Sequence, residues 1–165
     1  MSRTLRPLML AALVSAWLGT PVFADVTGFL GVASEPDNRS LFGFAAGGGF
    51  LVVGFEFEYM SVDEDVPARA PSLRTGMGNV YVQNPVPVSG LQFYATIGAG
   101  FYRERFGDGD VSISETNFGT NLGGGVKIGL AGPFKLRLDY RVFALQGDAR
   151  YDNPQRFYAG LTVAF

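Results

Sequence analysis

The chain of 165 residues contains neither cysteine nor histidine. A protein without cysteine cannot use disulfides for its stability. A protein without histidine lacks both the commonest general base at neutral pH and the commonest transition-metal ligand. These absences exclude most familiar hydrolase mechanisms, and the hydroxyl and carboxylate residues that are present show no nucleophile–base pairing. We therefore expect no catalytic residues, no metal site and no cofactor.

Long apolar runs are almost absent as well. One run, residues 8–18, follows a short basic segment and precedes Val22 and Ala24, which occupy the −3 and −1 positions of a small-residue cleavage site. The run is too short for a membrane-spanning helix, which needs ~20 residues. It predicts that residues 1–24 are a secretory signal peptide and that residues 25–165 form one domain. A retained N-terminal anchor is the alternative.

Neither sign of charge dominates the predicted domain. Without residues 1–24 the chain holds 11 Lys+Arg and 15 Asp+Glu, a balance that argues against nucleic acid as a partner. Aromatic residues make up 14% of the chain, and glycine contributes 23 residues. Such a composition is unlike that of a disordered chain. It is typical of β-barrels, whose strands alternate in polarity.

Extended segments recur along the whole domain. Each is close to the ~9–11 residues that a tilted membrane strand needs, and their number is even. Short turns that contain Pro or Gly follow the even-numbered segments, whereas polar loops follow the odd-numbered ones, a pattern typical of outer-membrane barrels. The predicted strands cover about residues 26–34, 40–48, 53–62, 75–84, 91–105, 116–130, 134–146 and 157–165. The predicted polar loops are residues 35–39, 63–74, 107–115 and 147–156.

Alternation within the strands indicates which face is apolar. In the last segment Phe157, Leu161, Val163 and Phe165 share one face, together with Ala159. The period alone does not distinguish a membrane barrel from a soluble ligand-binding barrel with an apolar interior, because inversion leaves it unchanged. The apolar faces are bulky and the polar faces are rich in glycine, which suits a narrow polar lumen. We therefore predict an all-β, eight-stranded, antiparallel up-and-down transmembrane β-barrel.

The last three predicted strands resemble a known family. They comprise a glycine-rich strand (residues 123–130), a strand in which Arg and Asp alternate with Leu and Tyr (134–143), and a terminal strand that ends in Phe165. They are similar to the outer-membrane β-barrel family, which includes the OmpA membrane domain, OmpX and small "porin family" barrels. The resemblance implies insertion in the outer membrane by the assembly machinery, which reads the terminal strand, after transport by periplasmic chaperones. We expect a monomer; the resemblance implies no single activity.

Charged residues on two strands are expected to meet inside the barrel. In a closed eight-stranded barrel, each strand faces the fourth strand further along, across a lumen barely wide enough for side chains. The third strand carries Glu56 and Glu58 on its inner face, and the seventh carries Arg137, Asp139 and Arg141. The sequence therefore predicts a cluster of opposite charges in the lumen.

The turn at residues 131–133 fixes a register for the strands that it joins. This register pairs Gly125 with Asp139, Gly123 with Arg141, and Lys127 with Arg137. The glycines leave volume for the long charged side chains. The last pair brings two like charges together, which is unfavourable unless an acid such as Glu56 or Glu58 bridges them.

The lumen cluster permits two interpretations. It is either a salt-bridge core that holds the barrel in shape or a gate in a narrow ion or small-solute pore. We favour the first, and with it a structural or surface-interaction role; a barrel enzyme that acts on lipid and a secreted soluble barrel are further alternatives. Arginines near the polar loops are expected to contact lipopolysaccharide phosphates, with Arg103 at the level where the barrel leaves the lipid. These arginines are Arg39, Arg69, Arg74, Arg103, Arg105 and Arg150.

Overall fold

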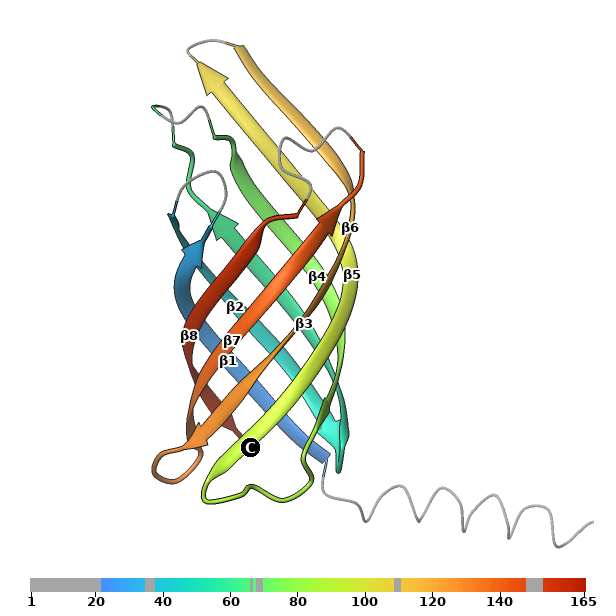
Figure 1. Cartoon of the computed structure of the whole chain (residues 1–165), viewed down its shortest axis with the longest axis vertical. Coiled ribbons are helices and arrows are strands. Elements are labelled where there is room, and N and C mark those ends of the chain that lie inside the picture. Colours follow the sequence, from blue (N-terminus) through green and yellow to red (C-terminus); the bar gives the residue numbers. More distant parts are fainter. Residues whose placement is uncertain (1–21, 35–37, 66, 68–69, 109–110, 148–152) are drawn as a thin grey trace, which may run out of the picture.

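The computed structural model describes residues 22–34, 38–65, 67, 70–108, 111–147 and 153–165. They form one closed barrel in which each strand pairs with the next along the chain (Figure 1). All pairs are antiparallel, so the predicted up-and-down topology is confirmed. The strands are β1 (Val22–Ala33), β2 (Arg39–Phe50), β3 (Val53–Val62), β4 (Ser72–Gln83), β5 (Leu91–Asp108), β6 (Val111–Gly129), β7 (Phe134–Leu145) and β8 (Gln155–Ala164).

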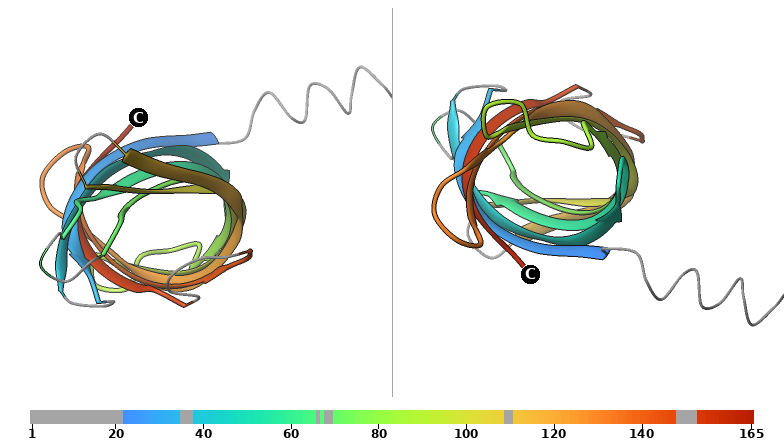
Figure 2. Two further views of the ribbon diagram at one scale, coloured as in Figure 1. Left: turned by 90° about the horizontal axis from the view of Figure 1, so that it is seen from above. Right: turned by 90° about the horizontal axis from the view of Figure 1, so that it is seen from below.

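The barrel closes between the first and the last strand. β1 pairs with β8 from Asp25 opposite Ala164 to Ala33 opposite Arg156. Two backbone hydrogen bonds between Ala24 and Phe165, of 3.1 and 2.9 Å, extend this seam. Closure leaves no open edge along the wall of the barrel, as the end-on views show (Figure 2). In the part of the chain that the structure describes, no helix is long and apolar enough to cross a membrane.

One predicted loop is wrong. The sequence predicts an irregular loop at residues 107–115, but β5 and β6 remain paired as far as Asp108 opposite Val111. The hairpin that they form extends beyond the other strands (Figure 1). Its residues are polar, yet Val111 and Ile113 are β-branched and alternate with serine, a pattern that suits a strand. Polarity in this segment therefore does not indicate irregular backbone.

Other strand ends differ by a few residues. β1 begins at Val22, inside the predicted signal peptide, so cleavage after Ala24 stays a prediction. β4 begins at Ser72 and β8 at Gln155, both within predicted loops. On the opposite end of the barrel, Gly90 and Gly132 adopt positive φ in the connections before β5 and β7, as expected for turns there.

The outer wall of the barrel is apolar. Large hydrophobic side chains cover it and are exposed, among them Phe42, Phe55, Phe93, Ile97, Phe101, Leu122 and Leu161. Polar and charged side chains are buried on the inner side of the same strands. This inverted arrangement is the one that a hydrocarbon solvent requires. It excludes a soluble barrel with polar residues outside.

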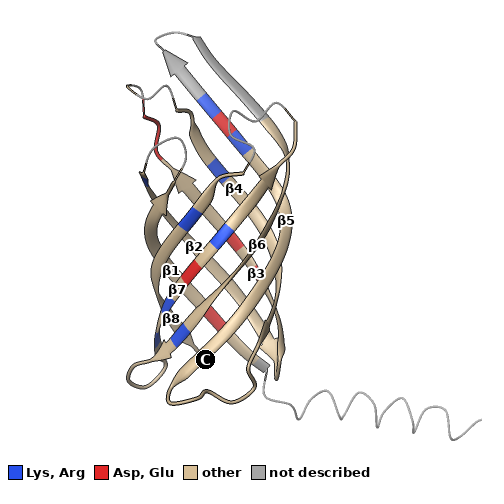
Figure 3. Ribbon diagram, in the orientation of Figure 1, with Lys and Arg blue, Asp and Glu red and all other residues tan. Residues whose placement is uncertain are grey.

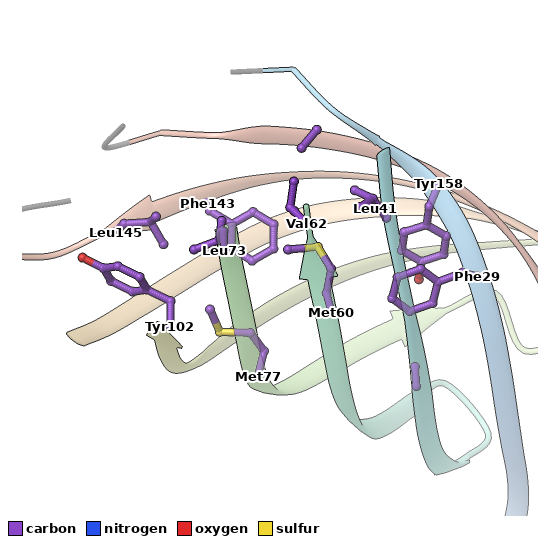
Figure 4. Packing of buried hydrophobic residues seen from close by; sticks show 12 residues of the cluster. Phe29, Leu41, Met60, Val62, Leu73, Met77, Tyr102, Phe143, Leu145 and Tyr158 are labelled. Atoms are coloured by element: carbon purple, nitrogen blue, oxygen red, sulfur yellow. The ribbon is translucent and has the colours of Figure 1, made fainter. Parts of the chain in front are cut away.

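The interior has two layers along the barrel axis. On β3, the inward side chains run from Glu56 and Glu58 to Met60 and Val62 as the strand approaches the polar loops. β7 follows the same order, with Arg137 to Arg141 before Phe143 and Leu145. The loop end of the lumen is therefore filled by an apolar segment (Figure 4). It comprises Phe29, Ala33, Leu41, Ala45, Met60, Val62, Leu73, Met77, Tyr102, Phe143, Leu145 and Tyr158.

Candidate functional site: the charged interior

β3 and β7 exchange ion pairs across the lumen. Arg137 donates to Glu56 with both terminal nitrogens, one of which lies 3.1 Å from Oε1. Arg141 lies 3.0 Å from the same Glu56 oxygen and 3.3 Å from Oε2 of Glu58. The structure therefore places the acids of β3 against the arginines of β7. Figure 3 shows acidic positions in red and basic positions in blue on the strands of the barrel.

Asp139 connects the two arginines on its own strand. Its carboxylate accepts hydrogen bonds from Arg141 Nε at 3.0 Å and from Arg137 Nη2 at 3.1 Å. The Tyr94 hydroxyl of β5 also donates to Asp139 and accepts from Arg137 Nε at 2.7 Å. The guanidinium carbon of Arg137 lies 4.8 Å from the centre of the Tyr94 ring. Tyr94 thus orients both charges, as an amphipathic ring does when it is buried with a partner for its hydroxyl.

Sequence reasoning misses Arg156. Its polarity suggests a place in the last polar loop, but it lies on β8 with only 2% of its surface exposed. Its Nη2 donates to Glu58 Oε1 at 2.5 Å. The sequence does contain an indication of this position. Arg156 is separated by an even number of residues from the inward-facing Tyr158 and Thr162, so it shares their face of the strand. Because β8 begins at Gln155, two residues before the predicted start of the last strand, Arg156 belongs to the strand and lies in the lumen.

Sequence reasoning also misses the acid that neutralises Lys127. Lys127 lies opposite Arg137, as the register predicts, but neither Glu56 nor Glu58 bridges the two cations. Lys127 Nζ instead contacts Asp25 Oδ2 of β1 at 2.5 Å. The bridging prediction is wrong because Asp25, which shares the inner face of its strand with Thr27 and Phe29, lies at the same level of the lumen as Lys127.

The eight charged residues of this cluster balance one another. Four cations and four acids form the ion pairs, and none is more than 7% exposed. A buried charge without a partner is costly, whereas a paired and hydrogen-bonded one is tolerated. We call these residues the lumen cluster: Asp25, Glu56, Glu58, Lys127, Arg137, Asp139, Arg141 and Arg156.

Glycines on β6 create the space for the cluster. Gly125 faces Asp139 and Gly123 faces Arg141, which confirms the predicted register. A Cβ atom at Gly125 would collide with the Leu138 carbonyl oxygen and would lie 2.6 Å from the Tyr94 hydroxyl. The absence of side chains at these two positions therefore permits the close packing of the charges.

Arg156 joins the lumen cluster to the apolar segment above it. Its guanidinium carbon lies 4.9 Å from the Phe143 ring centre and 5.7 Å from that of Phe29. Nη1 of Arg156 approaches the Met60 sulfur at 3.0 Å. Tyr158 stacks on Phe29 with ring centroids 4.1 Å apart. The two layers of the interior are thus packed against each other without a break at this contact.

The loop arginines divide into two groups. Arg39 is buried and donates to the carbonyl oxygens of Asp63 at 3.2 Å and Pro71 at 2.6 Å, so the expected lipid contact is wrong for this residue. Arg74, Arg103 and Arg105 are exposed on the outer wall. The remaining two, at positions 69 and 150, lie outside the described residues.

Comparison with known proteins identifies the fold. A family model described as "Outer membrane protein beta-barrel domain" matches residues 24–165. The chain belongs to the outer-membrane β-barrel family. It therefore lies in the outer membrane. Barrels of this kind have short turns on the periplasmic side and longer connections outside. A comparison of the sequence with curated proteins found no match.

Several solved structures share its fold. The N-terminal β-barrel domain of Pseudomonas aeruginosa OprF is 14% identical with a TM-score of 0.67, and the match covers 87% of this chain and 97% of that one. Neisserial surface protein A is 15% identical with a TM-score of 0.66, covering 87% and 95%. Ail, the attachment invasion locus protein of Yersinia pestis, is 12% identical with a TM-score of 0.56, covering 88% and 99%. The outer membrane enzyme PagL has the same fold at 13% identity, 84% and 98% coverage and a TM-score of 0.54.

Proposed function

We propose that this outer-membrane barrel is a non-conducting, non-enzymatic protein with a structural or surface-interaction role. In this proposal the lumen cluster is a permanent core that holds the strands together. The function then depends on the outer wall and on the segments that project from the outer end. The observation that carries the proposal is the complete pairing of charges in the lumen below a packed apolar segment.

The ion pairs argue against a gate. Arg137 and Arg141 both contact Glu56 and Asp139, so moving any one side chain breaks several contacts at once. Breaking a buried pair typically costs about 3–5 kcal/mol. A pore that opens readily needs a movable group with few contacts, and neither Arg137 nor Arg141 is such a group.

The apolar segment adds a second barrier in series with the first. Met60 and Phe143 lie between the lumen cluster and the outer end. An ion that passed the charges would then have to cross a region packed mainly with apolar side chains. Opening one barrier leaves the other closed.

Planar-bilayer recording tests this proposal. We expect no discrete openings in the wild type. Arg137→Ala is expected to stay silent, because the apolar segment still blocks the lumen, and so is Phe143→Ala, because the charges still block it. Openings in the wild type that enlarge in Arg137→Ala would instead support the alternative, a narrow pore gated by the lumen cluster. A gel in which unboiled and boiled samples migrate differently verifies that each variant is folded.

The absence of enzymatic activity is part of the proposal. PagL demonstrates that this fold can carry an enzyme, but the present chain has no histidine. The carboxylates of Glu56, Glu58 and Asp139 are engaged by guanidinium groups, so they are poor candidates for general bases. Mass spectrometry of lipid A from cells with and without the protein should give identical acylation patterns. A change in acyl-chain number on expression would refute this part of the proposal.

The β5–β6 hairpin supports the surface role. The pairing of β5 with β4 ends at Arg105, and that of β6 with β7 ends at Gly119. Beyond these residues the two strands pair with each other as far as Asp108 and Val111. A two-stranded hairpin gains little stability on its own, so we infer that its length serves contacts outside the membrane.

Surface labelling tests the display of this hairpin. Because the chain lacks cysteine, a single introduced thiol reports on one position. We expect a membrane-impermeant maleimide to label Thr116→Cys on intact cells and to leave Val86→Cys, in the periplasmic turn, unlabelled until the cells are lysed. Both side chains are exposed in the structure. Labelling of Val86→Cys alone on intact cells would reverse the orientation and remove the hairpin from the surface.

A further inference from the structure

Three arginines lie close together on the outer wall. Arg74 of β4 is directly opposite Arg103 of β5, and Arg105 follows two residues later on the same face. All three are exposed, and Figure 3 shows blue positions on β4 and β5 where the hairpin leaves the barrel. Glu104 occupies the other face of β5. Three exposed guanidinium groups on one face of neighbouring strands suit the binding of an anion with several oxygen atoms.

The rings directly below the arginines mark the membrane boundary. One row nearer the periplasm, Phe101 is flanked by Gly76 on β4 and Phe118 on β6. The two phenylalanine rings pack edge to face, with centroids 6.1 Å apart. Aromatic girdles border the apolar band of outer-membrane barrels. Arg74 and Arg103 therefore lie at the height of the lipid head groups in the outer leaflet.

A groove in the apolar wall begins one further row down. Its floor is a row of small residues that are consecutive partners across four strands: Gly78, Ala99, Thr120 and Ala144. Its sides are the larger residues of the next row: Val80, Ile97, Leu122 and Val142. Ala99 lies four residues from Arg103 along β5, a distance of about 13 Å at the usual rise of a strand. An extended acyl chain covers this distance.

We propose that Arg74, Arg103 and Arg105 bind a phosphate group of an outer-leaflet glycolipid, one acyl chain of which occupies the groove. Guanidinium groups form bidentate, charge-assisted hydrogen bonds with phosphate. The outward side chains of the groove are mostly apolar, with Asn153 lining it as well, so an acyl chain suits it. A phosphate and an acyl chain on the same molecule satisfy both features, and lipopolysaccharide has this chemistry.

Native mass spectrometry of the folded protein in detergent tests the site. The probes are bis-phosphorylated lipid A, the same lipid without its phosphates, and inorganic phosphate. We expect the first to bind more tightly than the other two. Arg74→Gln with Arg103→Gln should weaken its binding by roughly a hundredfold, because each of the two lost charge-assisted bonds is worth about one order of magnitude. Lys135→Gln, which removes a positive charge at the periplasmic end, is the control and should bind normally.

A second pair of variants tests the groove. A Cβ atom at Gly78 would meet only the Ala99 carbonyl oxygen, at 3.8 Å, so Gly78→Leu should fold and fill the groove. Gly28 on β1 also faces outward, and a Cβ atom at this position would have no neighbour within 4 Å; Gly28→Leu is the matched control. We expect only Gly78→Leu to weaken lipid A binding.

Four results would overturn the proposal. One is equal binding of lipid A by wild type and the double arginine variant. Another is equal affinity for inorganic phosphate and lipid A, which would indicate a free-phosphate site. The third is equal binding by Gly78→Leu and Gly28→Leu. The fourth is protection of the groove by a second copy of the chain, seen as a dimer that Gly78→Leu abolishes.

Discussion

Lys127 and Arg137 lie directly opposite each other on β6 and β7, but a different strand neutralises each of them. Lys127 contacts Asp25 of β1, whereas Arg137 contacts Glu56 of β3. Two adjacent cations thereby tie together four strands that are distributed around the barrel. The lumen cluster acts as a cross-brace for the wall, in addition to the backbone ladder that connects neighbouring strands.

Removal of Arg137 should destabilise the barrel strongly. Arg137→Ala leaves Glu56 and Asp139 with fewer partners in a buried site, and breaking a buried pair in this way costs about 3–5 kcal/mol. Urea unfolding of the protein in lipid vesicles, followed by the mobility shift on unheated gels, measures the change. Arg105→Ala is the control, because it removes an exposed guanidinium and should change the free energy of unfolding by no more than about 0.5 kcal/mol. Equal effects of the two substitutions would contradict the cross-brace.

Asp25 and Lys127 should be energetically coupled. Asp25→Asn leaves the buried ammonium group of Lys127 without its acid, so this single variant is expected to be clearly less stable than wild type. In Asp25→Asn with Lys127→Gln the unpaired charge is gone. The double variant should therefore lose less stability than the sum of the two single variants, with a coupling of about 0.5–3 kcal/mol. The same unfolding assay measures all four proteins, and strict additivity would show that the 2.5 Å contact contributes nothing.

The space at Gly125 should be indispensable. Gly125→Leu directs a side chain into the Tyr94 hydroxyl and the Leu138 carbonyl oxygen, and over-packing of this kind costs about 1–3 kcal/mol or more. We expect a large loss of folded protein after refolding into detergent. Gly28→Leu adds the same side chain on the outer wall and should refold as well as wild type. Refolding of Gly125→Leu at the level of Gly28→Leu would argue against a tightly packed lumen.

Most of the charged residues that face the lumen can be predicted from the alternation of side chains along the strands and from one turn. The turn at residues 131–133 fixes the β6–β7 register, and strand counting places Glu56 opposite Arg137. Arg156 and Asp25 escape this reasoning because they lie near the ends of strands, where polarity does not separate the last strand residue from a loop. The outcome for these two residues depends on backbone pairing that only the closed barrel defines.

The apolar segment of the lumen has no clear signal in the sequence. At Val142 and Phe143 consecutive residues are both apolar, so the alternation that identifies the inner face is lost. Residues 106–115 are missed for a different reason: their polar composition resembles a loop, although Val111 and Ile113 alternate with serine. Alternation assigns a face only where the two sides meet different solvents. It gives no information on what fills the interior where both sides are apolar.

Phe165 is expected to act in assembly and not in stability. Phe165 is 75% exposed, so its ring packs against little of the protein. Phe157, Leu161 and Val163 share its face and form the predicted recognition pattern for the assembly machinery. Phe165→Ser should therefore lower the amount of folded protein in the outer membrane of cells several-fold. It should change spontaneous refolding into detergent much less, because this refolding does not involve the assembly machinery.

A neighbouring residue supplies the control for this experiment. Phe134 lies at the same end of the barrel on β7, opposite Val163, and is also exposed. Phe134→Ser removes an equivalent ring from the lipid-facing wall without changing the terminal strand, so its assembly in cells should stay close to wild type. Pulse-chase labelling with unheated gels measures the rate for both variants. If the two assemble equally slowly, loss of apolar surface explains the defect and the terminal residue has no special role in recognition.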